Sequence, residues 1–357
     1  MAEYHTMTAQ TGTLKERDFV IDLFRFLGLS LIILAHVFPP NWLFQIRTFD
    51  VSLMVFVSGM AFCVSSGSKA NIIQYFYSRF KRMVLPAWAF VTLLYLVIFP
   101  LTGGLFADIN NHDQMMSSYK LQGFGYFWVI RVFLFISLFS IVYKFVMDKL
   151  SPIMLFVFYL LVETGLAIAF FHFGLFEKES LSGKVMWQAG FPVISYGVLF
   201  CLGYLFKSGR KDVYWYGAFS LLLMAAIEGW SLSQGQGPVW PQDFKYPPTL
   251  FYISWGIFAC AVLCLLANAL NLQSVRDSAL KRLVCFISSN TIWIYFWHIP
   301  LVEFFRRVDV TDSVWVKYLI AYTLPVLVVC VQRQVVKAIT RSRFTTVNGW
   351  VKTVFTG

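Results

Sequence analysis

The chain has 357 residues, of which 58% are hydrophobic and only 13% are charged, and its mean hydropathy is +0.67. A soluble domain carries about 25% charged residues, and a disordered or fibrous chain does not hold many aromatic residues, so the composition excludes these classes. The net charge of +11 indicates basic cytoplasmic loops rather than a nucleic-acid partner. The sequence therefore predicts an integral membrane protein.

Ten apolar spans follow one another along the chain, and each has about the length that a transmembrane helix needs. The first, residues 19–38, lacks a small-residue cleavage site and is predicted to be a retained helix rather than a signal peptide. The others lie near residues 46–66, 84–102, 125–147, 152–173, 189–206, 213–232, 250–272, 284–304 and 316–338. We expect an all-α membrane bundle of about ten helices, with a polar tail at 1–18, a helical domain at 19–338 and a basic tail at 339–357.

The distribution of Lys and Arg predicts the orientation of this bundle. If the N-terminus is cytoplasmic, 19 of the 29 basic residues lie in cytoplasmic segments and 8 lie in external segments. The other two, Arg25 and Arg131, lie within spans. Because Lys and Arg are enriched in cytoplasmic loops, the asymmetry places both termini in the cytoplasm.

The six cysteines lie inside apolar runs and form neither a CxxC pair nor a Cys/His cluster. Cys260 and Cys264 share a helix face, but two ligands do not complete a zinc site, and a free thiol in an apolar run behaves as a small hydrophobic side chain. We therefore expect no disulfide framework and no bound metal.

Arg25 lies within the first span, where burial of its charge costs about 2.5 to 3.5 kcal/mol at mid-bilayer. Asp22 precedes it by one turn on the same face and can pair with it. His36 follows Arg25 by eleven residues, which places both side chains on one helix face and about 16 Å apart along the axis. We interpret this face as the lining of a polar passage. A structural Asp22–Arg25 pair with a histidine that only hydrogen bonds across the bundle is the alternative.

Four segments of the chain resemble the motifs of membrane-bound acyltransferase family 3. They are 17–36, with Arg25 and His36 as an Arg-x10-His motif; 49–60, with Ser58-Gly59-Met60; 77–86, with Arg79-x-x-Arg82 and Leu85-Pro86; and 294–298, with Tyr295 to His298. Met60 replaces an aromatic residue of the family pattern, and Phe296 replaces a leucine. These specific motifs lie near the two ends of the chain, whereas the predicted topology resembles the family throughout.

The resemblance implies a multi-pass protein of the cell inner membrane that acylates, and commonly acetylates, a hydroxyl of a cell-surface or exported glycan such as lipopolysaccharide or exopolysaccharide. It implies acyl-CoA as the donor, without a metal. His36 is expected to be the general base, since an imidazole with a pKa of about 6.5 accepts a proton at neutral pH. Arg79, Arg82 and Arg25 are expected to bind acyl-CoA, because arginine donates bidentate hydrogen bonds to phosphate. A positive-inside anchor is the alternative for Arg79 and Arg82.

Several other polar residues are supporting or substrate candidates. Arg131 shares a helix face with Trp128 and can hold an acidic sugar or a partner carboxylate. Glu163 and Glu228 are candidates for that carboxylate or for orienting a histidine, and internal ion pairs explain them equally well. The remaining candidates are Asp22, Ser58, His298 as a second catalytic or a structural histidine, and Trp240 as a sugar platform or a loop anchor.

Two other functions stay open. A secondary transporter or glycan flippase would use the buried charges as a substrate or proton pathway, although no inverted repeat is visible. A non-catalytic partner in a polysaccharide-export complex would have lost the chemistry, whereas Arg25 and His36 are both present. The sequence also leaves open the sugar, the acyl group, and whether the chain forms a homodimer or joins a polysaccharide-assembly complex.

Overall fold

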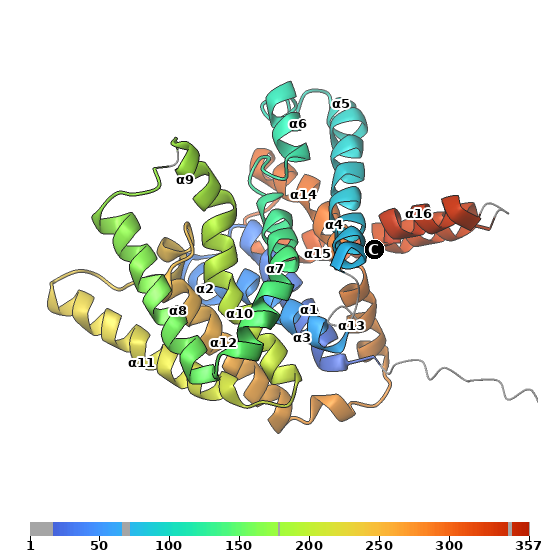
Figure 1. The fold of residues 1–357 in the computed structure, drawn as a ribbon. Coiled ribbons are helices and arrows are strands. Elements are labelled where there is room, and N and C mark those ends of the chain that lie inside the picture. Colours follow the sequence, from blue (N-terminus) through green and yellow to red (C-terminus); the bar gives the residue numbers. More distant parts are fainter. Residues whose placement is uncertain (1–16, 66–71, 178, 342–344, 357) are drawn as a thin grey trace, which may run out of the picture.

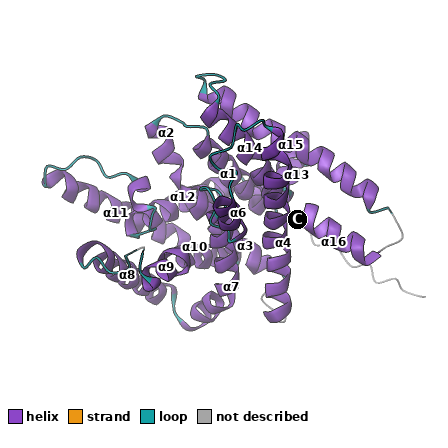
Figure 2. Ribbon diagram, turned by 90° about the horizontal axis from the view of Figure 1, so that it is seen from above, coloured by secondary structure: helices purple, strands orange, loops and turns teal. Residues whose placement is uncertain are grey.

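The computed structural model describes residues 17–65, 72–177, 179–341 and 345–356. These residues form helices joined by loops, with no β-strand among them (Figures 1 and 2). Within these ranges, eight helices are long and apolar enough to cross a membrane. The predicted all-α class is confirmed, and the chain is a multi-pass membrane protein. Four of the basic residues that contribute to the predicted orientation lie outside the described residues, namely Lys15, Lys69, Lys178 and Arg343.

Helices α3 and α10 lie at the centre of the bundle, with α8, α11 and α12 on the left of Figure 1 and α4, α13, α15 and α16 on the right. The helices in chain order are α1 (Phe19–His36), α2 (Asn41–Ile46), α3 (Asp50–Val64), α4 (Ile72–Leu93), α5 (Phe99–Leu101), α6 (His112–Tyr119), α7 (Trp128–Lys149), α8 (Pro152–Ala167), α9 (Leu181–Val185), α10 (Phe191–Lys207), α11 (Asp212–Ser233), α12 (Leu250–Ala269), α13 (Ala279–Ser289), α14 (Thr291–Arg307), α15 (Val314–Ile339) and α16 (Thr345–Thr356). Short π segments extend α4, α8 and α9, namely η3 (Leu94–Ile98), η4 (Ile168–His172) and η5 (Met186–Gly190), and 3₁₀ turns are η1 (Arg47–Phe49), η6 (Pro241–Phe244) and η7 (Leu272–Ser274).

Two glycines allow α3 and α10 to pack closely. A Cβ atom at Gly59 would overlap the backbone carbonyl of Phe200, and one at Gly203 would overlap the carbonyl of Phe56. Membrane helices gain little from hydrophobic burial against each other, so close contact between backbones is a main source of their association. This crossing fixes the position of α3, which carries part of the site.

Eight of the ten predicted spans coincide with one of the candidate membrane helices. The span predicted at 213–232 is α11, which carries Asp212 and Glu228 and is less apolar than the eight. The span predicted at 284–304 is not a single helix, because α13 ends at Ser289 and α14 begins at Thr291. The predicted count of about ten is therefore not confirmed.

The break between α13 and α14 follows from the polar run Ser288 to Thr291. The Asn290 side chain donates to the carbonyl of Phe286 at 2.6 Å, and Ser289 Oγ donates to the carbonyl of Cys285 at 2.7 Å. Such local bonds compete with the helix, and Asn290 leaves the helical region at φ −118° and ψ 18°. Irregular backbone at membrane depth is tolerated where it is covered by protein or lines a cavity.

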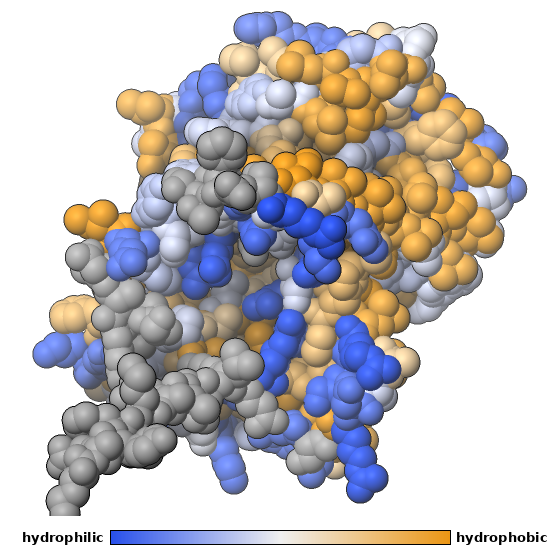
Figure 3. All heavy atoms as spheres, turned by 90° about the vertical axis from the view of Figure 1, so that its right-hand side faces the viewer, coloured by the Kyte–Doolittle hydropathy of each residue, from blue (hydrophilic) through white to orange (hydrophobic). Residues whose placement is uncertain are grey.

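Residues 345–356 of the predicted C-terminal tail form α16, which packs across α4 and α15. Trp293 Nε1 donates to the carbonyl of Val354 at 3.0 Å, and Gln332 Nε2 donates to the carbonyl of Phe355 at 2.7 Å. The face on this side of the molecule has a hollow bordered by hydrophilic side chains next to a broad hydrophobic area (Figure 3). Helix α16 therefore belongs to the folded bundle.

Candidate active site

Helix α1 carries Arg25 and His36 on one uninterrupted helix. Asp18 caps its N-terminus by accepting hydrogen bonds from two backbone N–H groups of the first turn. The helix ends at His36, shortly before Pro39-Pro40. The spacing predicted from the sequence, about 16 Å along the axis, therefore applies to the folded chain.

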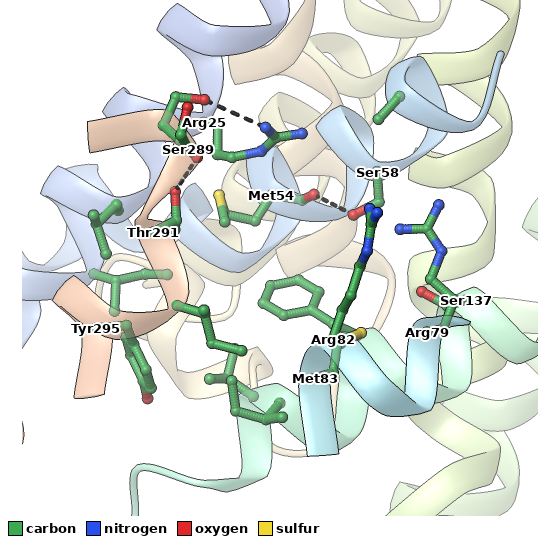
Figure 4. Close-up of a pocket in the computed structure, with 18 of the residues that line it drawn as sticks. Arg25, Met54, Ser58, Arg79, Arg82, Met83, Ser137, Ser289, Thr291 and Tyr295 are labelled. Atoms are coloured by element: carbon green, nitrogen blue, oxygen red, sulfur yellow. Dashed lines mark hydrogen bonds between the residues drawn. The ribbon is translucent and has the colours of Figure 1, made fainter. Parts of the chain in front are cut away.

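A pocket of about 270 Å³ lies beside Arg25, between α1, α3, α4, α7 and the break before α14. Arg79 and Arg82 point from α4 toward Ser58 on α3, and Arg25 reaches toward the same space from α1 (Figure 4). The break supplies three hydroxyl groups to the wall, from Ser288, Ser289 and Thr291. The structure thus brings together four residues that the sequence singled out: Arg25, Ser58, Arg79 and Arg82.

The predicted Asp22–Arg25 pair is present only as a long contact, with 4.0 Å between Arg25 Nη1 and Asp22 Oδ1. Asp22 is buried and instead pairs closely with Arg17, whose Nη2 donates to Asp22 Oδ1 at 2.8 Å. Ser288 Oγ also donates to Asp22, at 2.7 Å. Arg25 Nη1 donates only a long bond of 3.3 Å to Ser288 Oγ, so its guanidinium faces the pocket without a close carboxylate.

Arg79 and Arg82 have no ion pair within the described part of the chain. The Arg79 guanidinium lies 4.9 Å from the centre of the Tyr75 ring, and its buried Nε atom has no hydrogen-bond partner among the described residues. Ser58 Oγ donates to the carbonyl of Met54 at 2.9 Å. Three guanidinium groups therefore line one pocket without a carboxylate at hydrogen-bond distance, which is an arrangement suited to a polyanionic ligand.

His36 and His298 form a hydrogen-bonded pair at the end of α1. His36 Nδ1 lies 2.9 Å from His298 Nε2, and the two rings stack with 5.1 Å between their centres. His298 Nδ1 in turn bonds to the carbonyl of Tyr295. Both histidines are candidate site residues in the sequence, but the hydrogen bond between them could not be predicted from it.

This chain of bonds fixes the tautomers of the neutral rings. A carbonyl oxygen accepts only, so His298 Nδ1 carries the proton and its Nε2 is an acceptor. His36 therefore donates through Nδ1–H, which leaves His36 Nε2 as the basic nitrogen of the pair. His298 Nε2 is thus the acceptor that holds His36 in this tautomer.

Tyr295 and the face of α1 lie between the pocket and the histidine pair. Tyr295 lines the pocket, and its ring lies 4.8 Å from the ring of His298. Leu29 and Ile32, which also line the pocket, lie on α1 one to two turns before His36. Arg25 and His36 thus lie at successive depths along α1, and Arg79 and Arg82 on α4 line the same pocket as Arg25.

Glu303 is a buried carboxylate near the histidine pair that was not predicted from the sequence. Tyr126 Oη donates to Glu303 Oε1 at 2.6 Å, and the Tyr126 ring lies 4.9 Å from the ring of His36. Arg307 Nη1 donates to Glu303 Oε2 at 2.5 Å, and Arg307 Nη2 donates to Asp108 Oδ2 at 2.5 Å. Burial raises the pKa of the Tyr126 hydroxyl, and the Glu303 carboxylate raises it further. A carboxylate inside the apolar helix α14, shortly before two arginines, is the sequence signal that would have found Glu303.

A second network closes the same end of the bundle. Arg47 Nη1 donates to Asp50 Oδ2 at 2.5 Å, and Lys245 Nζ donates to Asp50 Oδ1 at 3.0 Å. All three side chains are buried. Burial lowers the pKa of Lys245, while the Asp50 carboxylate raises it. The network ties the loop before α12 to the start of α3.

Glu163 and Glu228 do not form the pairs that were considered for them from the sequence. Neither Glu163 nor Glu228 hydrogen bonds to a histidine or to Arg131 within the described residues. Both carboxylate oxygens of Glu163 are buried without a hydrogen-bond partner, and Glu228 Oε2 accepts from the backbone N–H of Val239 at 2.9 Å. Trp240 precedes η6, is 37% exposed, and does not line the pocket beside Arg25.

A family model described as an acyltransferase domain matches residues 19–331, which is most of the chain. The chain belongs to acyltransferase family 3. No curated protein and no solved structure matches it. Membership of this family together with the apolar helices makes the protein a membrane acyltransferase. Among the described residues, no group of three or more His, Cys, Asp or Glu side chains could hold a metal ion.

Proposed function

We propose that this acyltransferase is an O-acyltransferase that moves an acyl group, most simply acetyl, from cytoplasmic acyl-CoA to a hydroxyl of an exported or cell-surface glycan. One observation supports this above the others. Three arginines without a close carboxylate line one pocket, and α1, which contributes Arg25, Leu29 and Ile32 to that pocket, carries His36 one turn beyond Ile32. Acyl-CoA is a polyanion with a long neutral arm that ends in the thioester, so it matches the arrangement of arginines followed by a histidine along α1.

The donor enters from the end of the bundle where α1 begins, which the basic residues predict to be cytoplasmic. Arg79 and Arg82 hold the phosphates of CoA, because each guanidinium can donate two parallel hydrogen bonds to phosphate oxygens. Arg25 lies deeper and contacts the arm or the inner phosphates. The arm extends along the α1 face and brings the thioester to His36, about 16 Å farther along the helix.

His36 Nε2 acts as the general base in this scheme. It takes the proton of the acceptor hydroxyl as the oxygen attacks the thioester carbonyl, the C–S bond breaks, and CoA leaves as a thiolate. The imidazolium then returns its proton to the thiolate, so neither a covalent acyl-enzyme nor a metal is required. His298 holds the His36 ring in the tautomer that this step needs.

The acceptor approaches from the opposite end of α1, where His36 lies. We place the protein in the cell inner membrane with both termini in the cytoplasm, and the glycan, lipid-linked or polymeric, on the outer side. The protein works alone, as a homodimer or within a polysaccharide-assembly complex, with the lipid bilayer as its surroundings.

The test is acyl transfer by protein reconstituted in nanodiscs, with radiolabelled acetyl-CoA and the extracted glycans of the expressing cell. We expect His36→Ala to lower transfer by about a hundredfold or more, since general-base catalysis contributes about 10² to 10⁴. His112→Ala, at an exposed histidine on α6, is the matched control and should leave transfer unchanged. Undiminished transfer by a folded His36→Ala protein contradicts the assignment. Movement of glycan across vesicles without thioester cleavage would support the transporter or flippase alternative instead.

A further inference from the structure

A second pocket, of about 190 Å³, lies on the other face of α7 from the arginine-lined pocket. Helix α7 presents Val129, Ile130 and Phe133 to the first pocket. It presents Trp128 and Arg131 to the second. Trp128 begins α7 two residues after Tyr126, whose ring contacts His36. The second pocket therefore lies near the end of the bundle where His36 is located.

Arg131 is the cation of this pocket that has no partner among the described residues. Its Nε and Nη1 atoms are buried and make no hydrogen bond within the described chain. Lys245 also lines the pocket, but its ammonium is bonded to Asp50 at 3.0 Å. An unpaired buried donor is unfavourable, and more so when it is charged, so a ligand that accepts from Arg131 would recover that free energy.

The walls of the pocket are aromatic and hold no carboxylate. The rings of Trp128 and Tyr246 meet edge to face with 5.4 Å between their centres, and Tyr246 is 51% exposed. Trp187 adds a third ring, fixed by a bond of 3.1 Å from its Nε1 to the carbonyl of Phe176. The other lining residues are Val132, Gln188, Pro192, Tyr196, Pro247 and Pro248. An apolar wall with one convergent cation selects a ligand that has both an apolar face and a negative charge.

We propose that this pocket binds a carboxylate-bearing sugar residue of the acceptor glycan, and this inference rests on the proposed glycan O-acyltransferase function. The carboxylate accepts bidentate hydrogen bonds from Arg131, and a sugar face packs on the rings of Trp128 and Tyr246. The pocket is smaller than the roughly 300 to 1,000 Å³ of a drug-sized site, so it holds a single sugar ring. A neighbouring residue of the same glycan then presents its hydroxyl to His36.

The test is direct binding of acidic methyl glycosides to the protein in nanodiscs, measured by the change in tryptophan fluorescence. The probes are the methyl glycosides of glucuronic acid, galacturonic acid and N-acetylneuraminic acid, each compared with its own uncharged methyl ester. We expect at least one acid to bind about tenfold or more tightly than its ester. Arg131→Gln should remove that preference, and Arg131→Lys should retain part of it. Lys120→Gln, which removes an exposed charge at another site, should leave the preference unchanged.

Tyr246→Ala gives a second, independent variant at a half-exposed ring. It should weaken the acid and its ester equally, because both lose the same stacking surface. Equal binding of acids and esters by the wild type, or an acid preference that survives in Arg131→Gln, overturns the proposal. Acid-selective binding in a protein that transfers no acyl group supports this site and counts against the proposed enzymatic function.

Discussion

Basic side chains at the two ends of the site differ in whether they are paired with a carboxylate. Near the histidines, Arg47, Lys245 and Arg307 are each bonded to a carboxylate at 2.5 to 3.0 Å. In the pocket beside the start of α1, Arg79 and Arg82 have no carboxylate partner among the described residues. Removal of one partner from a buried ion pair leaves the other charge buried without compensation and destabilises the fold. An unpaired cation in a pocket is instead available to a ligand. The paired charges thus stabilise the fold, and Arg79 and Arg82 are expected to bind the donor.

The largest effect on stability is expected from removal of the Asp50 carboxylate, which pairs with Arg47 and Lys245. We expect Asp50→Asn to lower the free energy of unfolding by about 3 to 5 kcal/mol, because it leaves Arg47 and Lys245 buried without their common counter-charge. Thermal unfolding in detergent measures the effect. Asp148→Asn removes the same charge from a more exposed pair with Lys144, and we expect a loss of only about 0.3 to 0.5 kcal/mol. Equal losses would show that the Asp50 network is not structural.

The histidine pair lies between the two regions, and its substitution should act mainly on the rate of transfer. We expect His298→Phe to lower kcat by about tenfold to a hundredfold, with KM for acetyl-CoA unchanged, because His36 loses the acceptor that fixes its tautomer. His298→Gln offers an amide oxygen to His36 Nδ1 and should restore part of the rate. A Gln variant as inactive as the Phe variant would argue that His298 itself transfers the proton.

At the unpaired end, substitutions should change donor binding alone. We expect Arg79→Gln and Arg82→Gln each to raise KM for acetyl-CoA by about tenfold, or about 1.4 kcal/mol, with no change in melting temperature. Wild-type enzyme should discriminate against acetyl-dephospho-CoA, and the variant that has lost the contact to the 3′-phosphate should not. Arg276→Gln is the control at an exposed arginine outside the pocket. An unchanged KM in both variants leaves Arg79 and Arg82 as orientation signals.

The sequence predicted the parts of this site that depend on positions within one helix. The spacing of Arg25 and His36 follows from helix periodicity alone, and the continuous helix α1 places them as predicted. Contacts between distant segments could not be derived this way, since Tyr126 and Glu303 are 177 positions apart and Asp50 and Lys245 are 195 apart. Their partners are set by packing, which periodicity does not encode.

The error at residues 284–304 has a different origin. Apolar residues continue on both sides of Asn290, so the sequence predicts a single span, whereas Ser289 and Asn290 bond to preceding carbonyls and end the helix. The polar run was visible in the sequence, but its consequence depends on the cavity that accepts the hydroxyls. The same break supplies Ser288 and Thr291 to the pocket. A departure from regular helix thus coincided with the candidate site.

The smallest effect concerns Asp108, the outermost member of the paired region. Its hydrogen bond to Arg307 lowers the pKa of the Asp108 carboxyl, so the pair contributes stability above the unfolded pKa of an aspartate, about 3.9, and loses it as the pH falls through the lower folded value. The Asp108 side chain is 63% exposed, so solvent screens the pair and the contribution is small. We expect the melting temperature of Asp108→Asn to lie slightly below wild type at pH 7 and to converge with it at low pH. A difference that persists or grows at pH 3 would mean that Asp108 stabilises the loop through packing rather than charge.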